Sequence, residues 1–240
     1  VEGVVLQMKA MGIARVATFP FPEPPSPEAL RDAETCLGTL GAIGAPKSTA
    51  ATATTATSVA EFTRSVVDGP ITPLGRMLSR LPISPRLGKL LLVCRRDGLL
   101  PHGLLLVAML AQPDPSIIGD DSSADDATAD DDADGTPEEG AATPVRWKCV
   151  ESDALGMLGA YLQWRSMGGD EAAARMLRLT FKVMREAEQL ASQLRQLLRE
   201  LFPNDSDADD AREAPPEPPS KEEATALRKA LAAASPDRIA

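Results

Sequence analysis

Basic side chains gather in one stretch of the sequence, between residues 72 and 100, where six lysines and arginines stand against a single acid, Asp97. Lysine and arginine contacts with phosphates supply much of the affinity of proteins for nucleic acids. For any one of these side chains the alternative is an ordinary solvated helix face, but their grouping keeps a phosphate-binding surface open. A long helical segment further on also carries basic positions on its polar side. The candidate phosphate-contacting residues are Arg76, Arg80, Arg86, Lys89, Lys182 and Arg185.

The residues that most enzymes use for catalysis are scarce. His102 is the single histidine, so histidine-based triads and histidine-rich zinc sites have almost no material. The three cysteines are far apart and lack metal-ligand spacing, which favours reduced thiols in an intracellular protein. No glycine-rich loop followed by Lys-Ser or Lys-Thr is present, so the sequence has no P-loop. We therefore expect no catalytic residue, metal site or cofactor in this chain.

Aromatic residues make up only 3 % of the sequence, so the core must consist mainly of aliphatic side chains. Tyr161 and Trp164 have the flat rings that could stack on bases, but packing in a helical core is the interpretation we favour. No run of about 18 uninterrupted apolar residues occurs, which argues against a membrane span.

Charge is divided unevenly along the 240 residues, whose net charge is −10. Residues 120–139 hold ten acids and no base, and residues 203–240 carry a net −4, which leaves +4 for the rest. Such acidic, Gly/Ser/Ala- or Pro-rich stretches are typical of disorder. We predict a disordered acidic insert at 119–143. A solvated spacer is the interpretation we favour, and the alternatives are that it mimics RNA or recruits a basic partner. We also predict a mostly disordered tail at 203–240, with at most a marginal helix over 221–233.

The elements that would position the basic residues are mainly helical. Residues 1–83 show, in order, a helix, a proline-rich connector, a helix, a short β element and another helix, which is the order of a winged-helix domain. A segment rich in Ala, Thr and Ser at 44–68 lacks apolar periodicity and is expected to be a flexible insertion. A hydroxyl residue followed by proline predicts helix starts at Ser26-Pro27 and Thr72-Pro73. Pro82 and Pro85 end one helix and begin the next, which places a domain boundary near residue 83.

The second predicted domain, residues 84–202, is an all-helical bundle. Residues 104–110 are apolar almost all round, which indicates a helix buried on most sides. Apolar residues step by three or four from 170 to 201 and predict one long helix. The fold class is therefore mainly α, a winged-helix domain followed by a helical-bundle domain.

Five blocks of the sequence, in this order, are GVVLQMKAMGI, FPFPEPP, ITPLGRMLSRLPISPRLGKLLL, LLPHGLLLVAML and SDALGMLGAYLQWRSMG. Together they resemble the helicase-associated region of DEAH-box RNA helicases. The resemblance covers most of residues 2–202 outside 44–68 and 113–147. It implies that this chain is the C-terminal part of a longer enzyme, in which a winged helix and a ratchet bundle follow two RecA-like motor domains.

In that family the ratchet bundle lines the RNA channel and converts motor movement into stepwise motion along single-stranded RNA. The resemblance therefore implies RNA and the upstream motor domains as partners, with ATP and magnesium bound on the motor and no activity in this chain alone. The block FPFPEPP is closest to the nucleolar subgroup that acts in small ribosomal subunit biogenesis. That subgroup releases small nucleolar RNA from pre-ribosomal RNA, and implies a ribosome-assembly or activator protein as a further partner.

Three alternatives remain at this point. The chain could be a non-enzymatic helical module that binds a protein through its body and acidic insert. It could belong to a DEAH helicase of pre-mRNA splicing. A DNA-binding winged helix is the third, but no candidate recognition helix carries clear base-reading residues.

Overall fold

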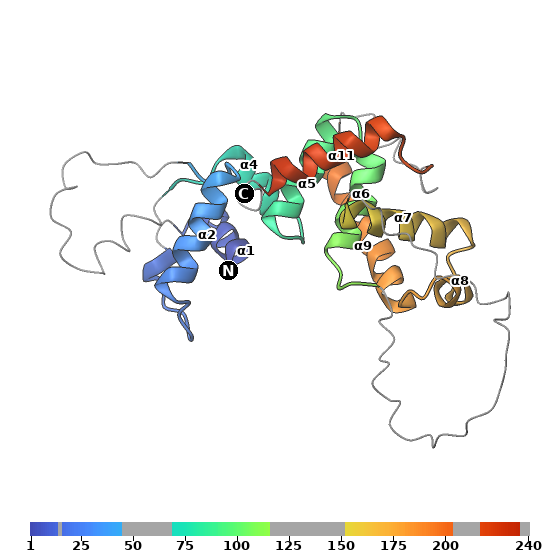
Figure 1. Ribbon diagram of the computed structural model, residues 1–240. Coiled ribbons are helices and arrows are strands. Elements are labelled where there is room, and N and C mark those ends of the chain that lie inside the picture. Colours follow the sequence, from blue (N-terminus) through green and yellow to red (C-terminus); the bar gives the residue numbers. More distant parts are fainter. Residues whose placement is uncertain (14–15, 45–68, 116–151, 204–216, 236–240) are drawn as a thin grey trace, which may run out of the picture.

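The computed structural model describes residues 1–13, 16–44, 69–115, 152–203 and 217–235 (Figure 1). These residues form nine α-helices and one short 3₁₀ helix, and they contain no strand of a sheet. None of the described helices is long and apolar enough to cross a bilayer. The helices are α1 (Glu2–Ala10), α2 (Pro27–Thr39), α4 (Pro73–Leu78), α5 (Pro85–Arg96), α6 (Leu100–Leu110), α7 (Asp153–Ser166), α8 (Glu171–Met176), α9 (Phe181–Leu201) and α11 (Lys221–Ala234), with the 3₁₀ helix η1 at Val16–Thr18.

Three helices begin at a residue whose side-chain hydroxyl caps the first turn. Ser26, Thr72 and Ser84 each accept a hydrogen bond from a backbone N–H in the first helical turn, at 3.1, 3.0 and 3.4 Å. Each cap is followed by a proline, which loses no hydrogen bond at the first helical position. The predicted starts of α2, α4 and α5 are therefore confirmed.

The N-terminal helices α1, α2 and α4 pack together around a short β contact. Ile43 and Ile71 form an antiparallel bridge, and the N–H of Gly44 donates to the carbonyl of Pro70 at 2.8 Å. The buried ammonium of Lys9 donates to the Gly69 carbonyl at 2.9 Å, which links α1 to the chain segment beside this bridge. The expected β element appears here as a single bridge, and the segment 45–68 lies outside the described residues.

Of the two phenylalanines in the proline-rich connector after η1, one is packed against the core and the other is exposed. The ring of Phe21 is half-buried and packs against the core, whereas 41 % of Phe19 is exposed. The two rings meet edge to face with centroids 5.0 Å apart.

Helix α6 forms the centre of the bundle. Nine of its eleven residues are buried, and it contacts α5, α7 and α9. This confirms the prediction of a helix buried on most sides. At Gly103 the helices α5 and α6 come so close that a Cβ atom would lie 2.5 Å from the Cβ of Cys94 and 2.9 Å from its sulfur. Glycine at this position therefore sets the spacing of the central helix pair.

Two segments differ from the sequence prediction. The long helix expected over 170–201 is broken into α8 and α9 by a turn at Leu177–Thr180. Leu177 and Leu179 are both buried, and residues two apart cannot face the same side of a helix. The turn is a Schellman motif, in which the N–H of Leu179 donates to Ala174 at 2.8 Å and that of Arg178 to Arg175 at 3.0 Å.

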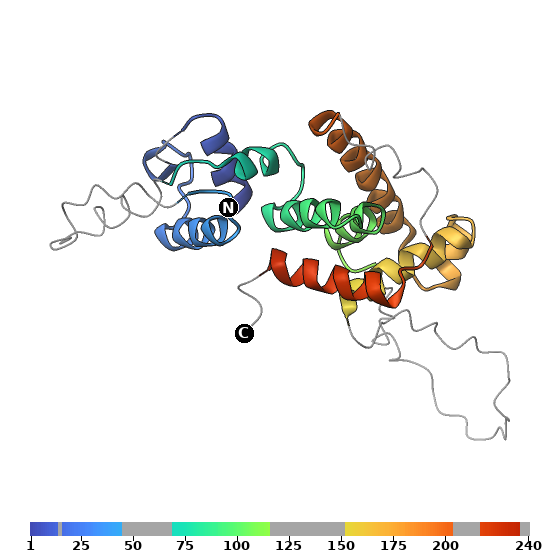
Figure 2. The same cartoon turned by 90° about the horizontal axis from the view of Figure 1, so that it is seen from above.

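The second difference concerns the C-terminal helix, which the sequence predicts over 221–233 as a marginal helix and which forms α11 with a packed face. Helix α11 lies along α5 (Figure 2) and buries Leu227, Ala230 and Ala234. Ser220 and Glu223 form a capping box at its start, and the ring of His102 on α6 donates to the Glu217 carbonyl at 2.9 Å. The apolar face of this helix is narrow, so its order depends on the partner helix rather than on its own pattern. The acidic insert predicted at 119–143 lies outside the described residues.

The Gly103 contact predicts a destabilising effect of a single methyl group. We expect Gly103→Ala to lower the free energy of unfolding by about 1–3 kcal/mol, because the new Cβ atom must push Cys94 and its helix away. Gly38→Ala is the matched control, since a Cβ atom at Gly38 in α2 would meet nothing within 4 Å. The control should be neutral or stabilising by at most about 1 kcal/mol. Urea denaturation measures both, and equal stabilities of the two variants would contradict the close contact.

The Schellman turn predicts a stabilising substitution. Arg178 adopts a φ of 55°, a left-handed conformation that glycine reaches without steric cost. We expect Arg178→Gly to raise the free energy of unfolding by about 1 kcal/mol. Arg175→Gly, in the helical last turn of α8, should instead lower it by about the same amount. A thermal melt of the two variants tests the opposite signs, and a loss of stability in both would contradict the turn.

Candidate nucleic-acid interface

The junction between α4 and α5 places four of the six candidate basic residues near one another. The side chains of Leu78 and Leu81 close over Gly88, where a Cβ atom would lie 2.8 Å from the Leu78 Cδ2 atom. This contact holds the end of α4 against the first turns of α5. Arg76 is on α4 and Arg80 follows it, while the remaining two are on the first turns of α5, Arg86 and Lys89.

These four side chains differ in exposure and pairing. Arg76 and Arg80 are exposed, and neither forms an ion pair with another described residue. Lys89 is half-buried on α5, three residues after Arg86 and on the same side of the helix. Exposed, unpaired guanidinium groups remain available for a phosphate.

Arg86 is engaged within the chain. Its Nη2 atom lies 3.5 Å from the Oε1 atom of Glu2 on α1, and the two side chains are 22 % and 30 % exposed. The pair bridges the N-terminal helices and the bundle across the junction. Arg86 therefore contributes to holding these two parts together, and a phosphate would have to compete with Glu2 for it.

Lys182 and Arg185 stand apart from this group, on the first two turns of α9. Acids follow at helical spacing: Lys182 faces Glu186 at 3.9 Å and Arg185 faces Glu188 at 3.2 Å. Glu188 also pairs with Arg165 of α7 at 2.7 Å. The local positive charge on this face is thus offset by carboxylates, which weakens its attraction for phosphates.

The aromatic pair on α7 belongs to the core. Tyr161 and Trp164 are 3 % and 0 % exposed, with ring centroids 5.7 Å apart. The Nε1 atom of Trp164 donates to the Asp170 carbonyl at 2.9 Å, which satisfies its only polar group. Burial, followed by the nearby Glu188 carboxylate, raises the pKa of Tyr161 to about 12. Neither ring has a free face for a base, so the core interpretation is confirmed.

A further arginine contact was not evident from the sequence. The guanidinium of Arg95, at the end of α5, lies 3.5 Å from the centroid of the Phe202 ring at the end of α9. Such a cation–π contact stabilises the packing of the two helix ends. No sequence pattern indicates a contact between two residues so far apart in the chain. The tandem arginines at 95 and 96 are the one local signal, and they point only to the arginine side of the contact.

Cys94 is one of the two buried free thiols in the part of the chain that the structure describes. Burial raises the pKa of the Cys94 thiol to about 12, so it stays protonated and unreactive. Across the part of the chain that the structure describes, no group of three or more His, Cys, Asp or Glu residues could hold a metal ion.

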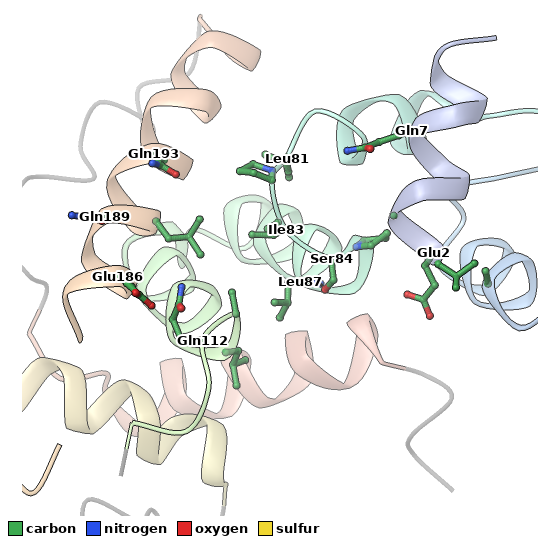
Figure 3. A pocket seen from close by; sticks show the side chains of 18 of the residues that line it. Glu2, Gln7, Leu81, Ile83, Ser84, Leu87, Gln112, Glu186, Gln189 and Gln193 are labelled. Atoms are coloured by element: carbon green, nitrogen blue, oxygen red, sulfur yellow. Dashed lines mark hydrogen bonds between the residues drawn. The ribbon is translucent and has the colours of Figure 1, made fainter. Parts of the chain in front are cut away.

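A broad groove lies between the N-terminal helices and the bundle (Figure 3). Its volume is about 1200 Å³. One wall comes from α1 and α2, the other from α9 and the end of α6, and the segment from Leu81 to Leu87 lies between them. The candidate arginines and lysines are not among the residues that line it.

The Arg86–Glu2 pair predicts a small coupling across the junction. Because both side chains are partly exposed, we expect a double-mutant cycle of Arg86→Gln and Glu2→Gln to give a coupling free energy of at most about 1 kcal/mol. Urea denaturation at low ionic strength measures it, and the value should fall as salt is added. A coupling that does not respond to salt would show that the two residues interact through packing and not through charge.

Comparison with known proteins shows similarity to RNA helicases. Residues 84–157 match the helicase associated domain (HA2), ratchet-like. The chain is 31 % identical, over its whole length, to the probable ATP-dependent RNA helicase kurz of Drosophila melanogaster, of which it covers 19 %. It is 36 % identical to human DHX37 over 46 % of its own length and 9 % of that protein. It is 35 % identical to yeast DHR1 over 49 % of its own length and 8 % of that protein.

Each of these three relatives is named as a probable ATP-dependent RNA helicase. The chain spans less than a fifth of the length of any of the three. The matched segment begins at the Ser84 cap of α5 and includes the central α5–α6 pair. The chain thus contains the helicase-associated, ratchet-like region of DEAH-box RNA helicases.

Proposed function

We propose that this chain is the C-terminal part of an ATP-dependent DEAH-box RNA helicase, in which it contributes to the RNA channel and couples motor movement to RNA translocation. The observation that carries the proposal is the match of residues 84–157 to the ratchet-like helicase-associated domain, together with the alignment of the whole chain to a helicase. The buried α5–α6 pair would give the channel wall a rigid support.

ATP hydrolysis would take place, with Mg²⁺, on RecA-like motor domains outside this sequence. In this proposal the chain is inactive alone. Residues 1–83 would form a winged helix that connects the bundle to the motor. The helices α1, α2 and α4 and the bridge between Ile43 and Ile71 are compatible with that role.

We further propose that the substrate is pre-ribosomal or small nucleolar RNA and that the enzyme acts in the nucleolus during small-subunit biogenesis. The support for this finer assignment is the connector FPFPEPP, which resembles the subgroup with that role. In this chain the connector contacts the body through Phe21.

Within the chain, the α4–α5 junction is the proposed RNA contact. Arg76 and Arg80 are its strongest members because they are exposed and form no ion pair with another described residue. Arg86 and Lys89, on α5, are the other members, and Arg86 forms an ion pair with Glu2. Lys182 and Arg185 are weaker candidates, since each already faces a carboxylate on α9.

The arginines on α4 give the test of this proposal. We expect Arg76→Glu combined with Arg80→Glu to weaken the binding of single-stranded oligouridine about tenfold or more, because two phosphate contacts become repulsive. The slope of log affinity against log salt should also become shallower by roughly 1.4. Fluorescence anisotropy measures both quantities, and circular dichroism checks that the helices remain.

The control has the same change in net charge at another place. Lys221→Glu combined with Lys229→Glu alters two exposed lysines of α11 that lie far along the chain from α4. Oligouridine affinity should stay within about twofold of the unmodified chain. Equal losses in the two double variants would reduce the effect to overall charge, and no loss in either would remove α4 as an RNA contact.

A further inference from the structure

The groove between the N-terminal helices and the bundle has a lining unlike that of the proposed RNA contact. Among the described residues that line it there is no lysine or arginine. Three carboxylates stand on its walls, Glu2 and Asp32 on one side and Glu186 on the other. Four amide side chains accompany them: Gln7, Gln112, Gln189 and Gln193.

This lining disfavours a nucleic-acid backbone. Phosphates need cations, and bringing them beside carboxylates costs free energy. Two of the groove carboxylates already face cations from outside the lining: Glu2 lies 3.5 Å from Arg86, and Glu186 lies 3.9 Å from Lys182. Asp32 is exposed and makes no ion pair with another described residue, so no described cation offsets it.

The same lining suits a polypeptide. Glutamine side chains carry both donors and acceptors and can pair with the N–H and C=O groups of an extended chain. Leu81, Ile83 and Leu87 lie between the walls and Leu190 on the α9 side, where they can receive apolar side chains. The volume of about 1200 Å³ exceeds the range of roughly 300–1,000 Å³ that is usual for small-molecule sites.

We propose that this groove binds an extended segment of a protein partner that carries lysine or arginine side chains between apolar ones. The carboxylates would select the basic side chains, the amides would hold the backbone, and the leucines and isoleucine would receive the apolar residues. This partner site is separate from the RNA contact at α4 and goes beyond the proposed helicase role.

The probe is a fluorescein-labelled peptide of repeated Lys-Val-Thr units, compared with a Glu-Val-Thr peptide and with oligouridine. We expect the full chain to bind the lysine peptide more tightly than the glutamate peptide. Asp32→Lys and Gln189→Lys, one on each wall, should each weaken the lysine peptide about tenfold, because a cation in the groove repels it.

Matched controls remove the effect of the acidic insert, which attracts any basic peptide. Glu23→Lys makes the same charge change as Asp32→Lys at an exposed connector position, and Gln196→Lys matches Gln189→Lys on the same helix. Neither control residue lines the groove, so the lysine peptide should bind both controls within about twofold of the unmodified chain.

Two results would overturn the proposal. If controls and groove variants lose the same affinity, the peptide binds only through the net charge of the chain. If Asp32→Lys tightens oligouridine and leaves the lysine peptide unchanged, the groove carries nucleic acid and not a peptide.

Discussion

The close contact between α5 and α6 is the constraint on which the rest of the structure depends. Gly103 allows the two helices to approach until the Cys94 side chain fills the space that a Cβ atom would need. Dispersion contacts at this distance are individually small, but α6 makes them on nearly all sides, with α5, α7 and α9. The positions of α4, α9 and α11 follow from this central pair, because α9 packs on α6, and α4 and α11 pack on α5.

Basic side chains at the junction between α4 and α5 differ in whether they pair within the chain. Leu78 and Leu81 close over Gly88 and leave the arginines around them at the surface. Of these, Arg86 is drawn to Glu2 across the junction, whereas Arg76 and Arg80 are not paired with a described residue. A single basic stretch in the sequence is therefore divided by the fold into one side chain that contributes to the internal structure and two that remain available to a ligand.

Local signals account for what could be predicted from the sequence. A cap followed by proline fixes a helix start through contacts within one turn, so Ser26-Pro27, Thr72-Pro73 and Ser84-Pro85 were reliable. The break at Arg178 was missed because a left-handed cap there carries an arginine in place of the expected glycine. The docking of α11 and the Arg95–Phe202 contact were missed because both depend on residues more than 100 positions apart, which no local pattern records.

The positions of the charged residues separate the surface into regions with different binding properties. Arg76 and Arg80 are exposed and pair with no acid among the described residues, whereas Lys182 and Arg185 of α9 face Glu186 and Glu188. The polar groups that line the groove between these regions are mainly carboxylates and amides, so a phosphate backbone that follows α4 would be repelled from its interior.

In the two proposals, RNA binds at the junction and a basic peptide binds in the groove. The charges of the two surfaces differ, so each ligand would be excluded from the other's surface and both could bind the same chain at once. Glu2 lies at the boundary, because it lines the groove and at the same time neutralises Arg86 of the junction.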